Sequence, residues 1–154
     1  MNIKKLKTSD KDIVLKCDEL YKKFLKSEKK YDSNFLERDD IKSFLNDLED
    51  DNKMLYAAIV KKEVVGFLYG YVSKNKNERN KVAHLTFLYV DYDYRKRKIA
   101  TNLIERFICD MSEKSIINIE VKVYDNNDIA KKLYKKFGFE ALWLNLRRCT
   151  NNNI

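Results

Sequence analysis

The chain has 154 residues and a mass of 18.4 kDa, which fits one domain of the usual size of about 150 residues. Its residues are 44% hydrophobic and 36% charged, which is typical of a packed core and excludes a disordered chain. No apolar run approaches the roughly 20 residues that span a bilayer, and no secretory signal opens the sequence. We therefore expect a cytoplasmic protein without a membrane partner, with one domain over residues 1–150 and a disordered tail over 151–154.

The charge balance favours an anionic ligand. Lys and Arg number 32 and Asp and Glu 24, which leaves a net charge of +8. A positive surplus suits a phosphorylated ligand, nucleic acid or an anionic surface, although lysines spread over solvated faces would give the same sum. Zinc-ligand spacing and an RNA-binding signature are both absent from the sequence, so we expect no nucleic-acid partner.

The three cysteines, Cys17, Cys109 and Cys149, lack the spacing of a metal site, and we expect no metal. Cys17 and Cys109 both fall on apolar helix stripes. This placement predicts buried free thiols, as in a reducing cytosol.

Hydrophobic periodicity predicts alternating strands and helices. In chain order these are a strand at 1–6, helices at 13–25 and 41–48, strands at 54–60, 64–72 and 82–90, a helix at 99–111, a strand at 116–124, a helix at 129–137 and a strand at 139–146.

This order predicts a single α/β (α+β) domain. The strand–helix–strand unit over residues 82–124 implies a right-handed parallel crossover. The hairpin before it makes the rest of the sheet antiparallel. We therefore expect a mixed, mostly antiparallel sheet of about six strands with helices on both faces.

A cationic turn joins the strand at 82–90 to the helix that follows. It contains Arg95, Lys96, Arg97 and Lys98. The free N–H groups and dipole of a helix N-terminus bind anions, so a pyrophosphate suits this place. A solvated basic turn is the alternative interpretation.

A second motif follows at residues 127–139, Asn-x-x-Ala-x-x-Leu-Tyr-x-x-Phe-Gly-Phe. Together with Arg95-x-x-Lys98-x-Ala100 upstream, it resembles the GNAT superfamily of acetyl-CoA-dependent N-acetyltransferases. The resemblance implies a GNAT-like domain, acetyl-CoA as co-substrate, and an amine acceptor that attacks directly in a ternary complex. A homodimer is compatible with it.

The resemblance also implies which residues bind the coenzyme. The edge at the end of the strand at 82–90, where it separates from its neighbour, would pair with the pantetheine arm. The amides of residues 96–101 would hold the pyrophosphate, and Asn127 would bond the coenzyme or bridge the separated strands. Alternatively, Asn127 is a helix N-cap. The implied set is Leu88, Tyr89, Val90, Arg95, Lys96, Arg97, Lys98, Ile99, Ala100, Thr101 and Asn127.

The sequence departs from the family pattern at two positions of the turn, where Lys96 and Lys98 replace frequent glycines. A side chain in the left-handed region costs about 1–2 kcal/mol, so the phosphate cradle is expected to be looser or reshaped. This departure leaves open a second function, a coenzyme- or ligand-binding module that is catalytically weak or idle.

Two residues are candidates for proton transfer. Tyr134 corresponds to the family tyrosine that protonates the departing thiolate, and core packing is its alternative role. His84 stands where several family members carry a base for the amine, and it shares a face with Thr86, Leu88 and Val90 if the strand alternates regularly. A structural histidine is the alternative.

The acceptor is the least defined part. Residues 37–51 hold seven acidic residues against two basic ones. Such a segment would attract a polycation such as a polyamine or an aminoglycoside, although an ordinary solvated helix face explains it as well. A protein or peptide amine is also compatible with the sequence.

Overall fold

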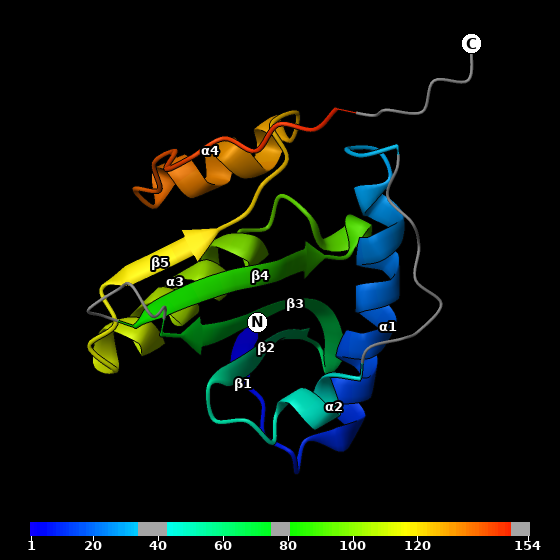
Figure 1. Cartoon of the computed structure of the whole chain (residues 1–154). Coiled ribbons are helices and arrows are strands. Elements are labelled where there is room, and N and C mark those ends of the chain that lie inside the picture. The colour runs from blue at the N-terminus through cyan, green and yellow to red at the C-terminus, as the bar shows by residue number, and fades with distance from the viewer. Residues whose placement is uncertain (34–42, 75–80, 149–154) are drawn as a thin grey trace.

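Five strands form one mixed sheet in the order β1-β2-β3-β4-β5 within the described part of the computed structural model, residues 1–33, 43–74 and 81–148 (Figure 1). The elements are β1 Asn2–Lys5, α1 Lys11–Glu28, α2 Phe44–Asp47, β2 Lys53–Val60, β3 Glu63–Ser73, β4 Val82–Val90, the 3-10 helix η1 Tyr92–Tyr94, α3 Ile99–Glu113, β5 Asn118–Val121 and α4 Asp128–Lys136.

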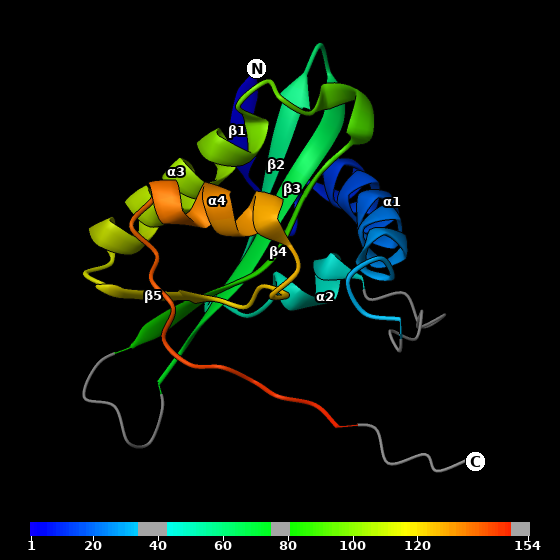
Figure 2. The same cartoon turned by 90° about the horizontal axis from the view of Figure 1, so that it is seen from above.

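The strand pairing confirms the predicted mixed sheet. β1, β2, β3 and β4 pair in sequence order and antiparallel, while β4 and β5 pair in parallel through the crossover helix α3. Helices α1 and α2 cover one face of the sheet, and α3 and α4 cover the other (Figure 2). None of the helices in the described ranges is long and apolar enough to cross a bilayer.

Both faces of the sheet are buried, so the central strands are apolar on both sides. In β2, Met54, Tyr56 and Ala58 pack into the core beneath α3, while Leu55 and Ala57 pack into the core beneath α1. The α1 core is rich in aromatic rings, which pack in tilted, stacked and edge-on pairs. Such pairs add stability beyond the area that they bury.

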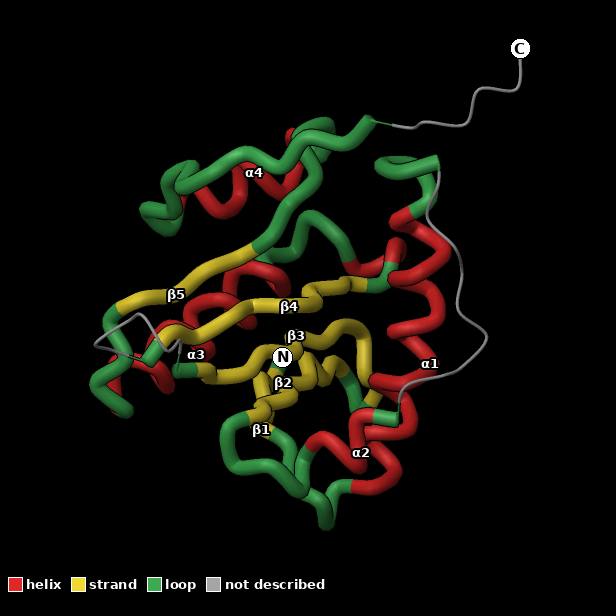
Figure 3. Tube along the Cα trace, viewed as in Figure 1, coloured by secondary structure: helices red, strands yellow, loops and turns green. Residues whose placement is uncertain are grey.

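The predicted sixth strand is wrong. Residues 140–148 follow α4 as irregular chain and pair with no strand among the described residues (Figure 3). The apolar side chains that suggested the strand, Leu142, Trp143, Leu144 and Leu146, are exposed. Strand propensity is realised only against a neighbouring strand, and this segment instead leaves the end of α4 and runs toward the end of α1, where Arg147 pairs with Asp32 (Figure 1). The predicted tail, 151–154, lies outside the described residues.

The predicted alternation of β4 also fails, because the strand contains a bulge. Tyr69 of β3 faces Phe87 and the next residue, Gly70, faces Leu85, so Thr86 is an extra residue in β4. Leu85 and Leu88 consequently pack on the same face, beneath α3, although they are three residues apart. His84 therefore lies on the opposite face from Leu88 and Val90.

One of the two predicted buried thiols is exposed. Cys17 is buried, and burial raises the pKa of its thiol to about 12. Cys109 is exposed, because it lies two residues from both Phe107 and Met111, which form the buried stripe of α3. Two residues correspond to about 200° around a helix, which places Cys109 on the solvent side. Cys149 lies outside the described residues.

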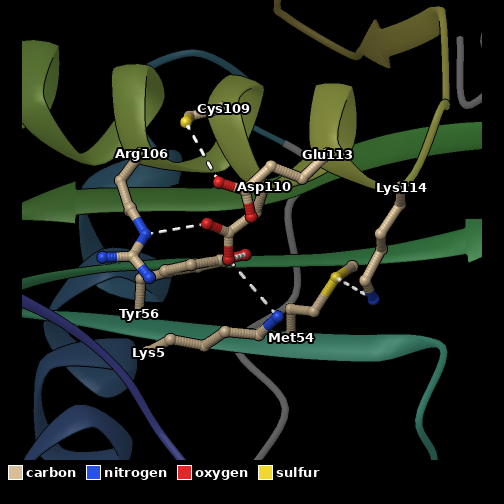
Figure 4. Close-up of polar contacts among 8 residues, drawn as sticks. All are labelled: Lys5, Met54, Tyr56, Arg106, Cys109, Asp110, Glu113 and Lys114. Carbon is tan, nitrogen blue, oxygen red and sulfur yellow. Dashed lines mark hydrogen bonds and ion pairs between the residues drawn. The ribbon is translucent and has the colours of Figure 1, made fainter.

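A buried carboxylate joins α3 to the first two strands (Figure 4). Asp110 is 6% exposed and accepts hydrogen bonds from Tyr56 Oη at 2.8 Å and Arg106 Nε at 2.8 Å, with Lys5 Nζ at 3.3 Å. Burial alone would raise the pKa of Asp110, but the hydrogen bonds from Arg106, Tyr56 and Lys5 outweigh it and hold the pKa below its ordinary value. The ionised carboxylate therefore stabilises the folded chain.

We predict that Asp110→Asn destabilises the protein by about 2 kcal/mol, because Arg106 and Lys5 lose their counter-charge and Tyr56 loses a charged acceptor. The stabilisation that Asp110 gives is present above the pKa of an unfolded Asp, about 3.9, and is lost as the pH falls below it. Urea unfolding at several pH values between 3 and 7 should therefore show a smaller acid loss in the variant. Tyr56→Phe, which keeps the carboxylate and both cations but removes one of the hydrogen bonds that lower the pKa of Asp110, is the control and should retain most of the acid loss of the wild type. An unchanged acid profile in Asp110→Asn would contradict the assignment.

Candidate active site

Strands β4 and β5 are paired at one end and separate at the other. Parallel pairing joins Val82–Leu85 to Asn118–Val121 and ends there. β4 continues to Val90, bonded to β3 on its other side. No strand in the described ranges pairs with the β5-facing edge of residues 86–90. An open cleft of 2940 Å³ lies along this edge and beneath α4.

The predicted phosphate turn closes one end of the cleft. After η1 the chain bends at Lys96, with φ +61°, and at Lys98, with φ +59°, and α3 begins at Ile99. The first helical hydrogen bond runs from Asn102 N–H to the Lys98 carbonyl at 3.0 Å. The N–H groups of residues 99–101 thus have no intrahelical acceptor and are available to an anion.

The two lysines adopt the backbone conformation that glycine would provide. A side chain in the left-handed region is strained by about 1–2 kcal/mol, so the turn keeps its shape at a cost in stability. Both lysines line the cleft, and a looser or reshaped phosphate cradle stays a prediction.

The two arginines of the turn have different places. Arg95 lines the cleft, donates from Nε to the Val90 carbonyl at 3.0 Å, and lies over the Tyr89 ring at 5.6 Å. It therefore holds the end of β4 as well as adding charge. Arg97 lies over the Tyr94 ring at 5.2 Å and is not part of the cleft wall. All the other predicted coenzyme residues line the cleft.

Tyr134 is fixed by the way α4 ends. Gly138 has φ +80°, its N–H bonds to the Lys135 carbonyl at 3.1 Å, and the Phe139 N–H bonds to the Tyr134 carbonyl at 3.2 Å. These two bonds form a Schellman motif, which brings the Phe139 ring to 5.5 Å from the Tyr134 ring. The Phe-Gly-Phe sequence thus sets the position of the tyrosine.

Tyr134 is 8% exposed and lines the cleft, and its hydroxyl hydrogen-bonds to no described residue. Burial, and then the negative charge of Glu28, raise the pKa of Tyr134. The phenol therefore keeps its proton at neutral pH. A hydroxyl that lines a cleft without a protein partner is suited to donate a hydrogen bond to a ligand.

Asn127 caps α4. Its Oδ1 accepts a hydrogen bond from the Ala130 N–H at 3.1 Å, which is the N-cap interaction weighed from the sequence. The residue also lines the cleft, where its amide nitrogen is still available as a donor.

His84 lies where β4 and β5 are still paired. Its Nε2 is 2.8 Å from Ser73 Oγ, its Nδ1 is 3.9 Å from Glu120 Oε2, and its ring stacks on Tyr71 at 4.7 Å. Glu120 is its partner in the parallel register. The structure thus places His84 in the cleft wall. It lies at the end where β4 and β5 are still paired, and three neighbours hold its ring.

The cleft wall also contains residues that the sequence did not single out. Glu28 ends α1 and is half-buried there, next to Tyr31 and Asp32. The Tyr31 ring stacks on Tyr124, which follows β5, at 6.0 Å. No motif in the linear sequence marks these residues, because two distant segments supply them.

The acidic segment has a partly structural role. Residues 37–42 lie outside the described residues. Within the remainder, Asp47 is 9% exposed and pairs with Lys53 Nζ at 2.8 Å, next to the aromatic core. This contact assigns Asp47 to packing between α2 and β2.

Comparisons with known proteins agree with this geometry. The model of the "Acetyltransferase (GNAT) family" matches residues 17–139. A search of curated proteins found no match. The chain belongs to the acetyltransferase (GNAT) family, and it is therefore an enzyme of the acyltransferase class.

Solved structures share the fold at low identity. An aminoglycoside acetyltransferase, meta-AAC0020, from an uncultured soil metagenomic sample is 19% identical with a TM-score of 0.76, over 97% of this chain and 96% of that one. The ribosomal-protein-alanine N-acetyltransferase of Brucella melitensis biovar Abortus 2308 is 20% identical with a TM-score of 0.68, over 97% and 99%. The aminoglycoside N-acetyltransferase AAC(6')-Iy in complex with CoA is 18% identical with a TM-score of 0.68, over 96% and 100%. At these identities the comparison establishes the fold.

We predict that Lys98→Gly is more stable than Lys98→Ala by about 1 kcal/mol, because both remove the charge and only glycine removes the left-handed strain. In a chain of this size, that difference corresponds to a shift of about 2–4 °C in the melting temperature. Thermal unfolding of the two variants measures it. Equal melting temperatures would show that position 98 carries no strain.

Proposed function

We propose that this chain transfers the acetyl group of acetyl-CoA to a primary amine by direct attack within a ternary complex. The observation that carries the proposal is the cleft itself. The unpaired edge of β4, the free amides that begin α3 and the Tyr134 hydroxyl all border one space. A long phosphorylated thioester needs these three features.

Each feature has a role in this proposal. The edge of β4 at Leu88–Val90 binds the pantetheine arm through backbone hydrogen bonds, as an added strand would. The amides of residues 96–101 and the charges of Arg95, Lys96 and Lys98 bind the pyrophosphate. Asn127 orients the first turn of α4 and with it Tyr134.

Tyr134 then acts on the leaving group. Its hydroxyl donates a hydrogen bond and finally a proton to the sulfur while the C–S bond breaks. The raised pKa keeps the phenol protonated before the reaction, so its proton is in place when the thiolate develops, and the proton that the attacking nitrogen loses restores the phenol. The cleft holds the two reactants together, which supplies most of the acceleration.

The amine is a small molecule, such as an aminoglycoside or a polyamine, or a protein or peptide amine. Solved structures with this fold include enzymes named for both kinds of acceptor. Release of free thiol from acetyl-CoA, measured across a panel of polyamines, aminoglycosides, amino acids and peptides, identifies the class. His84 remains a candidate base within this proposal, although its neighbours hold it at the closed end of the cleft.

A coenzyme-binding module without turnover is the second candidate, and the lysines at positions 96 and 98 favour it. It predicts that acetyl-CoA stabilises the chain against heat while no amine releases thiol. Transfer to any amine at a rate above the uncatalysed reaction rejects it.

We predict that Tyr134→Phe lowers kcat for acetyl transfer by about 100-fold or more, the usual contribution of a proton donor. The ring keeps its contact with Phe139, so melting temperature and the thermal shift with acetyl-CoA should stay the same. Thiol release measures kcat. Full activity in Tyr134→Phe would reject the phenol as the acid.

A further inference from the structure

Glu28 is a carboxylate without a partner in the wall of the cleft. Glu28 is half-buried at the last position of α1, where its backbone carbonyl accepts hydrogen bonds from the Tyr31 and Asp32 N–H groups. Its side-chain carboxylate, in the cleft wall, makes no hydrogen bond or ion pair with any residue in the described ranges. Burial raises the pKa of Glu28, and the charge of Lys30 lowers it by less. Burying a carboxylate without a partner is costly, and a bound cation would offset that cost.

The negative charge of Glu28 acts on the proposed acid. It raises the pKa of Tyr134, whose hydroxyl faces the same space, and also the pKa of Tyr124, after burial in each case. Glu28 and Tyr134 are therefore near enough to interact electrostatically across one cavity, although they come from α1 and α4. A reacting amine between them would face a carboxylate on one side and the breaking C–S bond on the other.

Three contacts fix the end of α1 around Glu28. Tyr31 stacks on Tyr124, the Tyr31 carbonyl accepts a hydrogen bond from Asn126 Nδ2 at 3.1 Å, and Arg147 Nη1 pairs with Asp32 Oδ2 at 2.8 Å. They tie α1 to the loop before α4 and to the segment after it, which Figure 1 shows approaching the end of α1. The carboxylate is thus held in place relative to α4.

The surroundings also suit a cation. Aromatic rings attract ammonium groups through their faces, and the Lys30 ammonium already lies 4.7 Å from the centre of the Tyr31 ring. Tyr31 also stacks on Tyr124, so the Tyr124 ring, which lines the same cleft, is the one left for an acceptor ammonium, with Glu28 as its counter-charge.

We propose that Glu28 is the base of the acetyl transfer: its carboxylate binds the ammonium of the acceptor and removes the proton before attack. The inference rests on the proposed function and names a residue for a step which that function leaves open. A primary amine of pKa about 10.4 is more than 99% protonated at pH 7, so this step is required.

The protons balance over the reaction. Glu28 takes one proton from the ammonium, and the neutral nitrogen forms the C–N bond with the acetyl carbon. As the C–S bond breaks, Tyr134 gives its proton to the sulfur, and the second proton lost by the nitrogen restores the phenol. The proton on Glu28 then leaves to solvent, which returns the carboxylate.

The test is the pH profile of Glu28→Gln. At pH 7 we expect kcat/KM for the amine to fall by about 100-fold, because a general base contributes at least that much. The loss should shrink tenfold for each pH unit toward the pKa of the amine, since the neutral amine needs no base. The KM for acetyl-CoA and the melting temperature should stay as in the wild type, and Glu28→Asp should recover part of the rate.

The charged and titratable groups around Glu28, which the Glu28→Gln and Glu28→Asp variants keep, are Lys30, Tyr31, Asp32, Tyr124, Tyr134 and Arg147.

Glu19→Gln is the matched control. Glu19 lies on the exposed face of α1, paired with Lys16 at 3.0 Å, and its loss changes the net charge by the same amount. It should leave the rate and its pH profile unchanged.

Each outcome decides the role of Glu28. A wild-type pH profile in Glu28→Gln, while Tyr134→Phe is inactive, overturns Glu28 as the base and leaves the proposed function standing. A higher KM for the amine with unchanged kcat and pH profile also overturns it, because Glu28 then only binds the cation. Failure of the wild-type chain to release thiol with any amine overturns both proposals.

Discussion

The separation of β4 from β5 is the constraint on which the rest of the site depends. The pairing of β4 with β5 ends at Leu85, and the extra residue of the bulge, Thr86, comes directly after it. A bulge bends the strand that contains it and increases its twist, so β4 turns away from β5 at this point. Gly70 permits the close packing opposite, because a Cβ there would lie 2.6 Å from the His84 carbonyl oxygen and 2.8 Å from the Phe107 ring. One local irregularity thus opens the cleft and frees a strand edge for a ligand.

The features that the sequence predicted correctly are those that local chemistry determines. The buried stripes of α1 and α3 are periodic over several turns, and Gly138 ends α4 in the left-handed conformation expected of it. The predictions that failed depended on distant partners. Residues 139–146 have an apolar pattern suited to a strand but pair with no described strand, and the face of His84 depends on a bulge that the alternation of β4 does not reveal.

The candidate site divides in the same way. The turn at residues 95–98 and the motif around Tyr134 are each continuous in sequence. Their spacing was therefore enough to identify them as candidate site residues. Glu28 is different, because its importance comes from its place in the same cleft wall as Tyr124 and Tyr134, whose pKa values its charge raises and which lie about a hundred positions farther along the chain. In the sequence it is one acidic residue in a polar stretch at a helix end. Only the folded arrangement shows a carboxylate without a partner beside a phenol.

The lysines of the turn change how the cleft can hold a phosphorylated ligand. Glycine at positions 96 and 98 would bring amides close to a phosphate without strain. Lysine retains the same backbone angles at a cost of about 1–2 kcal/mol each, and each can return about 1.5–3 kcal/mol through a charge-assisted hydrogen bond. The strain and the gain from the hydrogen bond are similar, so replacing glycine by lysine is close to neutral in free energy. The replacement does shift phosphate binding from backbone amides to mobile side-chain charges. Such binding weakens with salt.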